Sequence, residues 1–437
     1  MSLKPKQILK GNNVLIIIYS VVFFFLIFQK AIYSPDTYGF LKAMPNRHLG
    51  YVVFLKIFTF LFSDGFDLAV KSFQILFSLA SIHFFLKKVT QILTLNIFSK
   101  SIVLLVLLFP LFQPMYVANN LCPEGISYSL YLLFVALNLD FIFKNNTNAF
   151  KLALIVFIAL VFTRGQFMFS YLIFALVFFL KYRSQLKFKT NILKLLTLIF
   201  IPVVIIFGEM SYHKLKDGIF MTTPFGFTNM SSAAYYISEK EDAILITNQD
   251  YNIIFKTSYE ELERKKLLMS SQSNSNYKDN YAFFHDHIPQ ICNRTTYEIA
   301  RTYFLNKDIG SSEKSKFDIA QSFYKAEKAN KEITQVLIRK NFKKWIQLYF
   351  ANLSHSFYSP IFFFLILFIF IYSAIKVFTK YNKWHALLFI FTALSLSNAL
   401  LIAIFSHSIM RYVFYNYVLI LLSLFIIFKI FRHGIKD

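Results

Sequence analysis

Asp36 is a carboxylate on a short segment between two apolar stretches of the chain. It lies in the segment 34–38, which reads SPDTY, and the next acidic residue is Asp64. An ionisable side chain close to a lipid bilayer is costly, so such residues usually face a polar cavity or a charged partner. A positioned carboxylate can take a proton from a hydroxyl group. Asp36 is therefore a candidate general base, and the alternative is that it caps the helical turn that follows.

Several other polar residues lie beside the ends of different apolar stretches, among them Arg47, Arg164 and Arg411. Guanidinium groups bind phosphate oxygens and stabilise negative charge on a leaving group. A helical bundle that brought these ends together would form a phosphate site; otherwise each arginine only extends its charge to the membrane interface. His407 could add to the phosphate site or be an interfacial loop residue. Glu124 could contact the hydroxyl groups of a substrate, or be favoured by the helix dipole.

Patterns for metal binding and disulfides are sparse. His285, Asp286 and His287 are the only metal-like cluster, but the two imidazoles would share a face only in an extended strand, and no further ligand is evident. We expect this cluster to be a solvated polar loop, and we expect no metal or other cofactor. The two cysteines, Cys122 and Cys292, are expected to be unpaired thiols, although one bridge could form if the fold brought them together.

The composition predicts an all-α polytopic membrane protein. Of 437 residues, 56% are hydrophobic and only 16% are charged, whereas a soluble domain has about a quarter charged residues. Apolar runs long enough to span a hydrocarbon core recur along the chain. We predict about ten transmembrane helices, near residues 13–29, 67–86, 101–118, 125–143, 150–163, 167–181, 191–208, 358–376, 385–405 and 410–430.

Basic residues predict the orientation of these helices. If the predicted spans cross the membrane in alternating directions, most Lys and Arg, from Lys4 to Lys436, lie on one face. By the positive-inside rule this face is cytoplasmic, and both termini lie on it. The net charge of +23 therefore indicates contact with membrane lipids and not with nucleic acid. The predicted parts are an N-terminal transmembrane module (1–208) with a first outer loop (30–66), a mostly helical extracytoplasmic domain (209–357) and C-terminal transmembrane helices (358–437). Within them, we expect interfacial helices at 50–62 and 338–346.

An ordered set of short motifs resembles one protein family. The segments 35–38 (PDTY) and 47–51 (RHLGY), followed by a short helix and a second span, are similar to the first outer loop of the GT-C superfamily of polyprenyl-phosphate-sugar-dependent membrane glycosyltransferases. That superfamily includes protein O-mannosyltransferases and lipid A aminoarabinose transferase. The likeness continues at 123–127 (PEGIS), 163–164 (TR) and 410–412 (MRY). Many relatives have an Asp-Glu pair in the first loop, whereas Thr37 follows Asp36 here.

The resemblance implies an inverting glycosyltransferase that moves a sugar from a polyprenyl-phosphate donor to a hydroxyl-bearing acceptor. The expected place is the outer face of a bacterial inner membrane. Two alternatives are a transporter or flippase for lipid-linked saccharides and an O-antigen polymerase or ligase. The implied roles are a base at Asp36, donor phosphate binding by Arg164, Arg411, Arg47 and His407, and substrate binding by Glu124, Tyr38 and Tyr412.

Overall fold

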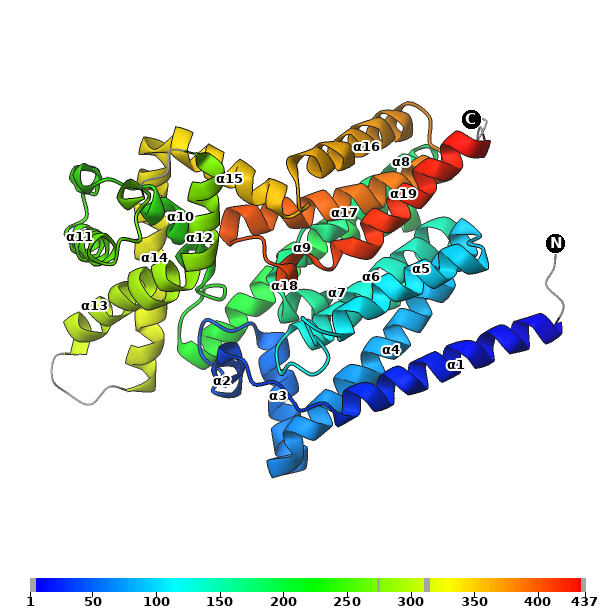
Figure 1. The fold of residues 1–437 in the computed structure, drawn as a ribbon, viewed down its shortest axis with the longest axis horizontal. Coiled ribbons are helices and arrows are strands. Elements are labelled where there is room, and N and C mark those ends of the chain that lie inside the picture. The colour runs from blue at the N-terminus through cyan, green and yellow to red at the C-terminus, as the bar shows by residue number, and fades with distance from the viewer. Residues whose placement is uncertain (1–4, 273–275, 310–314, 434–437) are drawn as a thin grey trace.

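The chain folds almost entirely into helices. The computed structural model describes residues 5–272, 276–309 and 315–433 (Figure 1). Helices make up 83% of the chain. Across the described residues there is no strand, only an isolated bridge between Ile32 and Asn120. The predicted all-α class is confirmed.

A bundle of long helices forms the larger part of the molecule, and every predicted span overlaps one of them. Helices α1 and α19 begin and end, respectively, at the same end of this bundle (Figure 1). Lys4 and Lys436, which entered the prediction of the orientation, lie outside the described residues. The bundle helices are α1 (Pro5–Phe28), α4 (Phe66–Leu93), α5 (Ile97–Leu108), α6 (Glu124–Lys144), α7 (Thr147–Thr163), α8 (Ser170–Tyr182), α9 (Lys189–Asp217), α16 (Pro360–Thr379), α17 (Lys383–Phe405) and α19 (Asn416–His433).

Five helical segments in the described part of the chain are long and apolar enough to cross a membrane. At about 1.5 Å per residue, roughly 20 helical residues match a hydrocarbon core of about 30 Å. Three further apolar helices are shorter than this, so length and composition establish five candidate spans and not ten. The five are Glu124–Lys144, Gly165–Gln185, Lys189–Asp217, Pro360–Thr379 and Lys383–Phe405.

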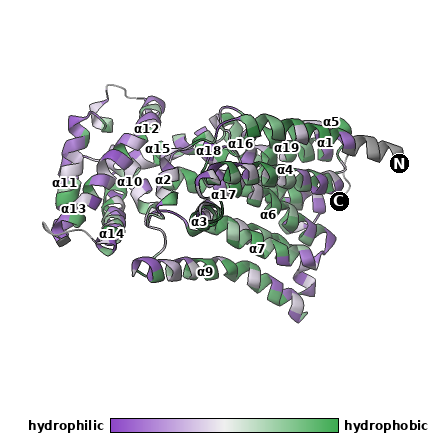
Figure 2. Cartoon of the chain, turned by 90° about the horizontal axis from the view of Figure 1, so that it is seen from below, coloured by the Kyte–Doolittle hydropathy of each residue, from purple (hydrophilic) through white to green (hydrophobic). Residues whose placement is uncertain are grey.

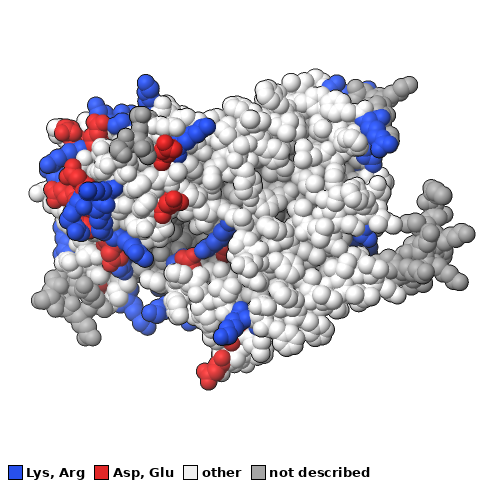
Figure 3. Space-filling view, in the orientation of Figure 1, with Lys and Arg blue, Asp and Glu red and all other residues white. Residues whose placement is uncertain are grey.

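Burial separates the centre of the bundle from its surface. The most apolar windows of α6 and α17 are 89% and 78% buried, whereas those of α9 and α16 are 17% and 28% buried. The outer helices therefore present apolar side chains to their surroundings, which suits lipid better than water. Figure 2 shows the hydrophobic bundle beside a more polar domain, and in Figure 3 the side of the bundle is nearly free of charged residues, which gather at the two ends of the molecule.

The first loop contains two short helices, α2 (Pro35–Leu41) and α3 (Leu49–Phe62). Helix α3 confirms the helix predicted at 50–62, and its C-terminal end is exposed and apolar, with Phe60 86% exposed. The predicted last span is divided, because α18 (Met410–Val413) is separated from α19. Helix α9 continues to Asp217, past the boundary predicted at residue 208.

The polar domain has a hydrophobic core of its own, in which Phe255, Leu262 and Ile333 are fully buried. Two predictions need correction here. His285, Asp286 and His287 lie on a helix and not in a loop, because hydrophobic residues spaced along the same segment bury one helical face. The predicted interfacial helix at 338–346 instead starts at Phe342, after a break between two helices. The domain contains α10 (Gly226–Tyr236), α11 (Gln249–Arg264), α12 (Tyr277–Ile291), α13 (Tyr297–Ile309), α14 (Lys316–Lys340) and α15 (Phe342–His355).

Candidate functional site

The first loop is held against the segment that precedes α6. The backbone N–H of Ile32 donates to the carbonyl of Asn119 (2.8 Å), and the N–H of Leu121 donates to the carbonyl of Ile32 (2.9 Å). The hydroxyl of Thr37 donates to the carbonyl of Leu121 (3.0 Å). Because Glu124 is the first residue of α6, these bonds bring α2 close to a second carboxylate that is distant in sequence.

Local capping explains why α2 begins where it does and leaves Asp36 free for other contacts. Ser34 is the N-cap residue, and Pro35 occupies the first helical turn, where its fixed φ and missing N–H are tolerated. The N–H of Ser34 donates to the hydroxyl of Thr37 (3.0 Å). Thr37 therefore takes part in the cap, whereas the oxygens of Asp36 bind arginines.

Five charged side chains from different elements form what we term the arginine–carboxylate cluster. Asp36 binds Arg47 through Oδ1 (3.0 Å) and Arg411 through Oδ2 (2.7 Å). Arg411 also donates from Nε to Oε1 of Glu124, and the same oxygen binds Nη1 of Arg164 (2.6 Å). Arg411 thus links the two carboxylates.

Small and aromatic neighbours fix Arg47 in this position. A Cβ atom at Gly39 would lie 2.6 Å from Nε of Arg47, so a glycine is needed for the guanidinium to pass. The guanidinium carbon lies 5.0 Å from the centre of the Phe40 ring, which supports it by a cation–π contact.

The other two guanidiniums share an aromatic neighbour. The ring of Tyr412 lies 5.0 Å from the guanidinium carbon of Arg164 and 5.7 Å from that of Arg411. Arg164 also donates from Nε to Oε1 of Gln166 (2.5 Å). Gln166 in turn donates to Asn398 on α17 (2.9 Å), so the loop after α7 is tied to a central helix of the bundle.

The cluster has an excess of positive charge and unused hydrogen-bonding atoms. Three guanidiniums face two carboxylates, which leaves one net positive charge if all are ionised. Buried Nε of Arg47 and buried Oε2 of Glu124 have no hydrogen-bond partner among the described residues. Burial would raise the pKa of Asp36, but the charges of Arg411 and Arg47 outweigh it and hold this pKa below its usual value. The cluster is therefore suited to an anion that also offers hydroxyl groups.

A cavity of about 580 Å³ adjoins the cluster, and all five charged residues line it. It lies where the ends of α6, α7 and α17 meet the first loop and α10. Its size is in the range of small-molecule binding sites, about 300 to 1,000 Å³. The lining is mixed, with apolar side chains such as Phe405 and Ile206 beside the charged ones.

A second polar group in the cavity was not predicted from the sequence. Nδ1 of His48 lies 3.0 Å from Oε1 of Glu209, and the hydroxyl of Thr223 donates to the same oxygen (2.6 Å). His48 belongs to the segment 47–51 (RHLGY), but it was assigned no role of its own from the sequence. The signal for Glu209 is its spacing from His213 and Asp217, because positions i, i+4 and i+8 share one face of a helix, and all three residues are buried.

The predicted site residues do not all meet. Tyr412 lines the cavity, but Tyr38 does not and is 56% exposed. His407 is also outside the lining and lies in a group of histidines, with its ring centre 5.1 Å from that of His285. Burial, reinforced by His285, His355 and Arg411, lowers the pKa of His407 to about 3, so it is neutral at physiological pH. Of the four residues predicted to bind the donor phosphate, the three arginines line this cavity and His407 does not.

Both cysteines are buried free thiols, as predicted. In the described residues, no group of three or more metal-ligating side chains is arranged to hold a metal ion.

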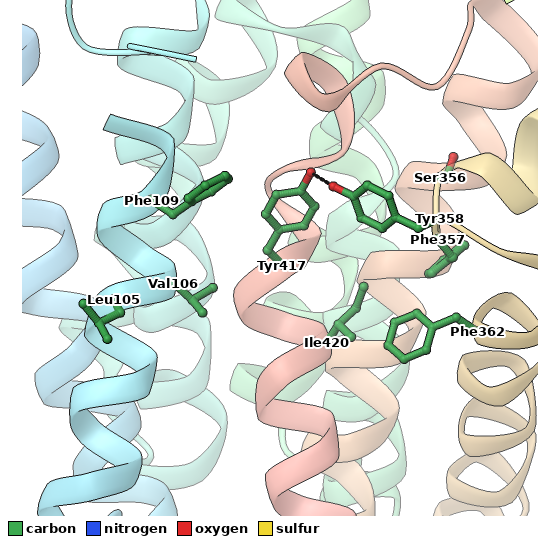
Figure 4. A pocket seen from close by; sticks show the side chains of 9 residues that line it. All are labelled: Leu105, Val106, Phe109, Ser356, Phe357, Tyr358, Phe362, Tyr417 and Ile420. Carbon is green, nitrogen blue, oxygen red and sulfur yellow. Dashed lines mark hydrogen bonds between the residues drawn. The ribbon is translucent and has the colours of Figure 1, made fainter. Parts of the chain in front are cut away.

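A different cavity, of about 460 Å³, lies between α5, α16 and α19 and is almost entirely apolar (Figure 4). Its polar lining residues are Ser356, Tyr358 and Tyr417, and the hydroxyls of the two tyrosines are hydrogen-bonded to each other. None of the described residues that line it is charged.

Comparisons with known proteins add no relative: no family model, no curated protein and no solved structure matches this chain. The fold and the site thus define this chain as an all-α protein that has helices long and apolar enough to cross a membrane and a cavity lined by charged residues at one end of its helical bundle.

Proposed function

We propose that this protein is a membrane glycosyltransferase. It moves a sugar, with inversion, from a polyprenyl-phosphate donor to a hydroxyl group of a lipid, glycan or protein acceptor. The observation that carries the proposal is the convergence of three arginines and two carboxylates on one cavity at the end of an apolar bundle. The resemblance of the loop motifs to the GT-C superfamily supports the same reaction.

The charge of the cluster suits this donor. A polyprenyl-phosphate sugar is a phosphodiester with one negative charge, which matches the single excess positive charge of the cluster. When the bond from the sugar to phosphate breaks, the leaving phosphate gains charge, and guanidiniums stabilise such charge more in the transition state than in the ground state. The unpaired Oε2 of Glu124 can accept a hydrogen bond from a sugar hydroxyl.

We further propose ten membrane crossings, with both termini on the cytoplasmic side of a bacterial inner membrane and the cavity at the outer surface. Helices in all ten predicted ranges support this arrangement, as does the position of α1 and α19 at the same end of the bundle. In this orientation the cavity faces the head-group region, where a polyprenyl phosphate presents its sugar.

The sequence assigned the base to Asp36, which borders the cavity and is ionised at neutral pH because of its arginine partners. Two roles are compatible with this geometry. Asp36 could accept the proton of the acceptor, or it could serve as the counter-ion that holds Arg47 and Arg411 in place.

The test is turnover of synthetic undecaprenyl-phosphate sugars by the purified protein in nanodiscs. We expect release of undecaprenyl phosphate and glycosylation of a hydroxyl compound, both detected by mass spectrometry. A chelator should have little effect, whereas strong inhibition by a chelator would indicate a metal-bridged pyrophosphate donor and thus a polymerase or ligase. Tight binding without any turnover, together with transport in vesicles, would instead indicate a transporter or flippase.

A further inference from the structure

The pair formed by His48 and Glu209 has the geometry of an oriented base. An ionised carboxylate only accepts hydrogen bonds, so Nδ1 of His48 donates to Oε1 of Glu209 across the 3.0 Å contact. Nε2 of a neutral imidazole is then left without a proton and can accept one. The side chain of His48 is 36% exposed, and both residues line the cavity that contains the arginine–carboxylate cluster.

The surroundings hold this pair in one orientation. Glu209 accepts a second hydrogen bond from Thr223 (2.6 Å), whose hydroxyl oxygen lies 3.2 Å from Nε2 of His213 on α9. On the other side, Gly165 faces the imidazole of His48. A Cβ atom at Gly165 would lie 3.2 Å from Cε1 and 3.5 Å from Nε2 of His48, so the absence of a side chain leaves room beside Nε2.

Asp36 is less suited to accept a proton than this pair. Each of its two carboxylate oxygens already binds a guanidinium, at 3.0 and 2.7 Å. A proton acceptor needs an accessible lone pair, which Nε2 of His48 offers, whereas both oxygens of Asp36 are engaged by guanidiniums. The other ionisable groups around the pair are Arg47, next to His48 in sequence, Arg164, next to Gly165, and His213, whose Nδ1 lies 2.8 Å from Oδ2 of Asp217.

We propose that His48, oriented by Glu209, is the proton acceptor for the hydroxyl group that attacks the sugar, and that Asp36 instead holds the arginines in place. The proposal rests on the proposed function. The acceptor oxygen forms a bond to the anomeric carbon while the bond from that carbon to the phosphate oxygen breaks, and its electron pair leaves with the phosphate. The acceptor proton moves to Nε2, and the resulting imidazolium is stabilised by Glu209 until it releases the proton to solvent.

The experiment measures release of undecaprenyl phosphate from a synthetic undecaprenyl-phosphate sugar between about pH 5 and 9, with water or an added hydroxyl compound as acceptor. The wild-type rate should fall towards the acid side, because a protonated imidazole cannot accept the proton of the hydroxyl group. His48→Gln should lower the rate at neutral pH by at least ~10²-fold and abolish this acid limb. Glu209→Gln should lower the rate about tenfold and move the acid limb to lower pH, whereas Glu209→Asp should restore part of the activity.

Binding of undecaprenyl phosphate separates failure of this inference from failure of the proposed function. All three variants should bind it as the wild type does, and the control His287→Gln, on α12 of the polar domain, should behave as the wild type throughout. If the wild type turns over the donor and His48→Gln keeps its rate and acid limb, the base is elsewhere and only the inference fails. Loss of binding in a folded His48→Gln protein would make His48 a donor-binding residue and also refute the inference. If the wild type does not bind undecaprenyl phosphate, the function and the inference fall together.

Discussion

Replacement of Arg411 is the most direct test of the phosphate site. Arg411→Ala removes the side chain that links Asp36 and Glu124, and it lowers the net charge of the cluster from one positive to zero. A charge-assisted hydrogen bond contributes about 1.5 to 3 kcal/mol, so loss of one contact to phosphate should weaken donor binding by roughly 10- to 100-fold. Arg411→Lys should restore part of the affinity, because an ammonium keeps the charge but not the fork of donors.

The same variant should also destabilise the protein. Glu124 is 4% exposed, and removing one partner from a buried ion pair costs about 3 to 5 kcal/mol when the remaining charge is left alone. Because Arg164 still binds Glu124 at 2.6 Å, we expect a loss near the lower end of this range. Arg411→Ala should therefore fold with a lower Tm, which a thermal-shift measurement in detergent detects.

The assay is binding of undecaprenyl phosphate to protein in nanodiscs, measured by thermophoresis at two salt concentrations. Arg432→Ala is the matched control, because Arg432 is exposed at the C-terminal end of α19, whereas Arg411 precedes the N-terminal end of this 18-residue helix. It should bind as the wild type does. Unchanged affinity in a folded Arg411→Ala protein would refute phosphate binding by Arg411 and leave it a structural link between two carboxylates.

Three further outcomes follow from the described contacts. Asp36→Asn should slow donor turnover but keep the acid limb of the pH profile, since its proposed role is to hold the arginines. Burial lowers the pKa of His407 to about 3, so as the pH falls the unfolded chain binds a proton at this histidine before the folded protein does. The free energy of unfolding should therefore be highest above the usual histidine range and fall by up to about 2 kcal/mol by pH 5. His407→Asn should reduce the accompanying loss of Tm. If the proposed orientation holds, a maleimide reagent that cannot cross the membrane should label Lys278→Cys, which is exposed on the polar domain, and not Lys87→Cys in intact cells.

Each of these outcomes can fail in a specific way. Loss of the acid limb in Asp36→Asn, with the limb retained in His48→Gln, would return the base role to Asp36. An unchanged acid sensitivity in His407→Asn would show that other groups determine it, and Lys278→Ala is a suitable exposed control for that measurement. Labelling of Lys87→Cys but not Lys278→Cys would invert the proposed orientation. The two native cysteines should contribute little background, because both are buried.

The sequence was sufficient for features that depend on local patterns. Apolar runs predicted the helices of the bundle. In an apolar environment a segment pairs its backbone polar groups within a helix and carries apolar side chains along its whole length, so it leaves a long apolar run in the sequence. The same reasoning predicted the helix at 50–62 in the first loop and a mostly helical domain over 209–357. It also identified all five members of the cluster, because charged residues beside apolar stretches are few and therefore conspicuous. It failed at 285–287, where three polar residues suggested a loop within a helix.

Only the tertiary structure decided which of these residues meet. Asp36 binds Arg411, 375 positions later, and nothing in either segment specifies its partner. Their contact results from the docking of the first loop on the segment before α6 and from the packing of α17 and α19, which are long-range events. The pairing of His48 with Glu209, 161 positions apart, arises in the same way. Sequence patterns reveal the periodicity of single helices. A charged site forms only where the ends of several helices meet, and the packing of the whole bundle determines where they meet.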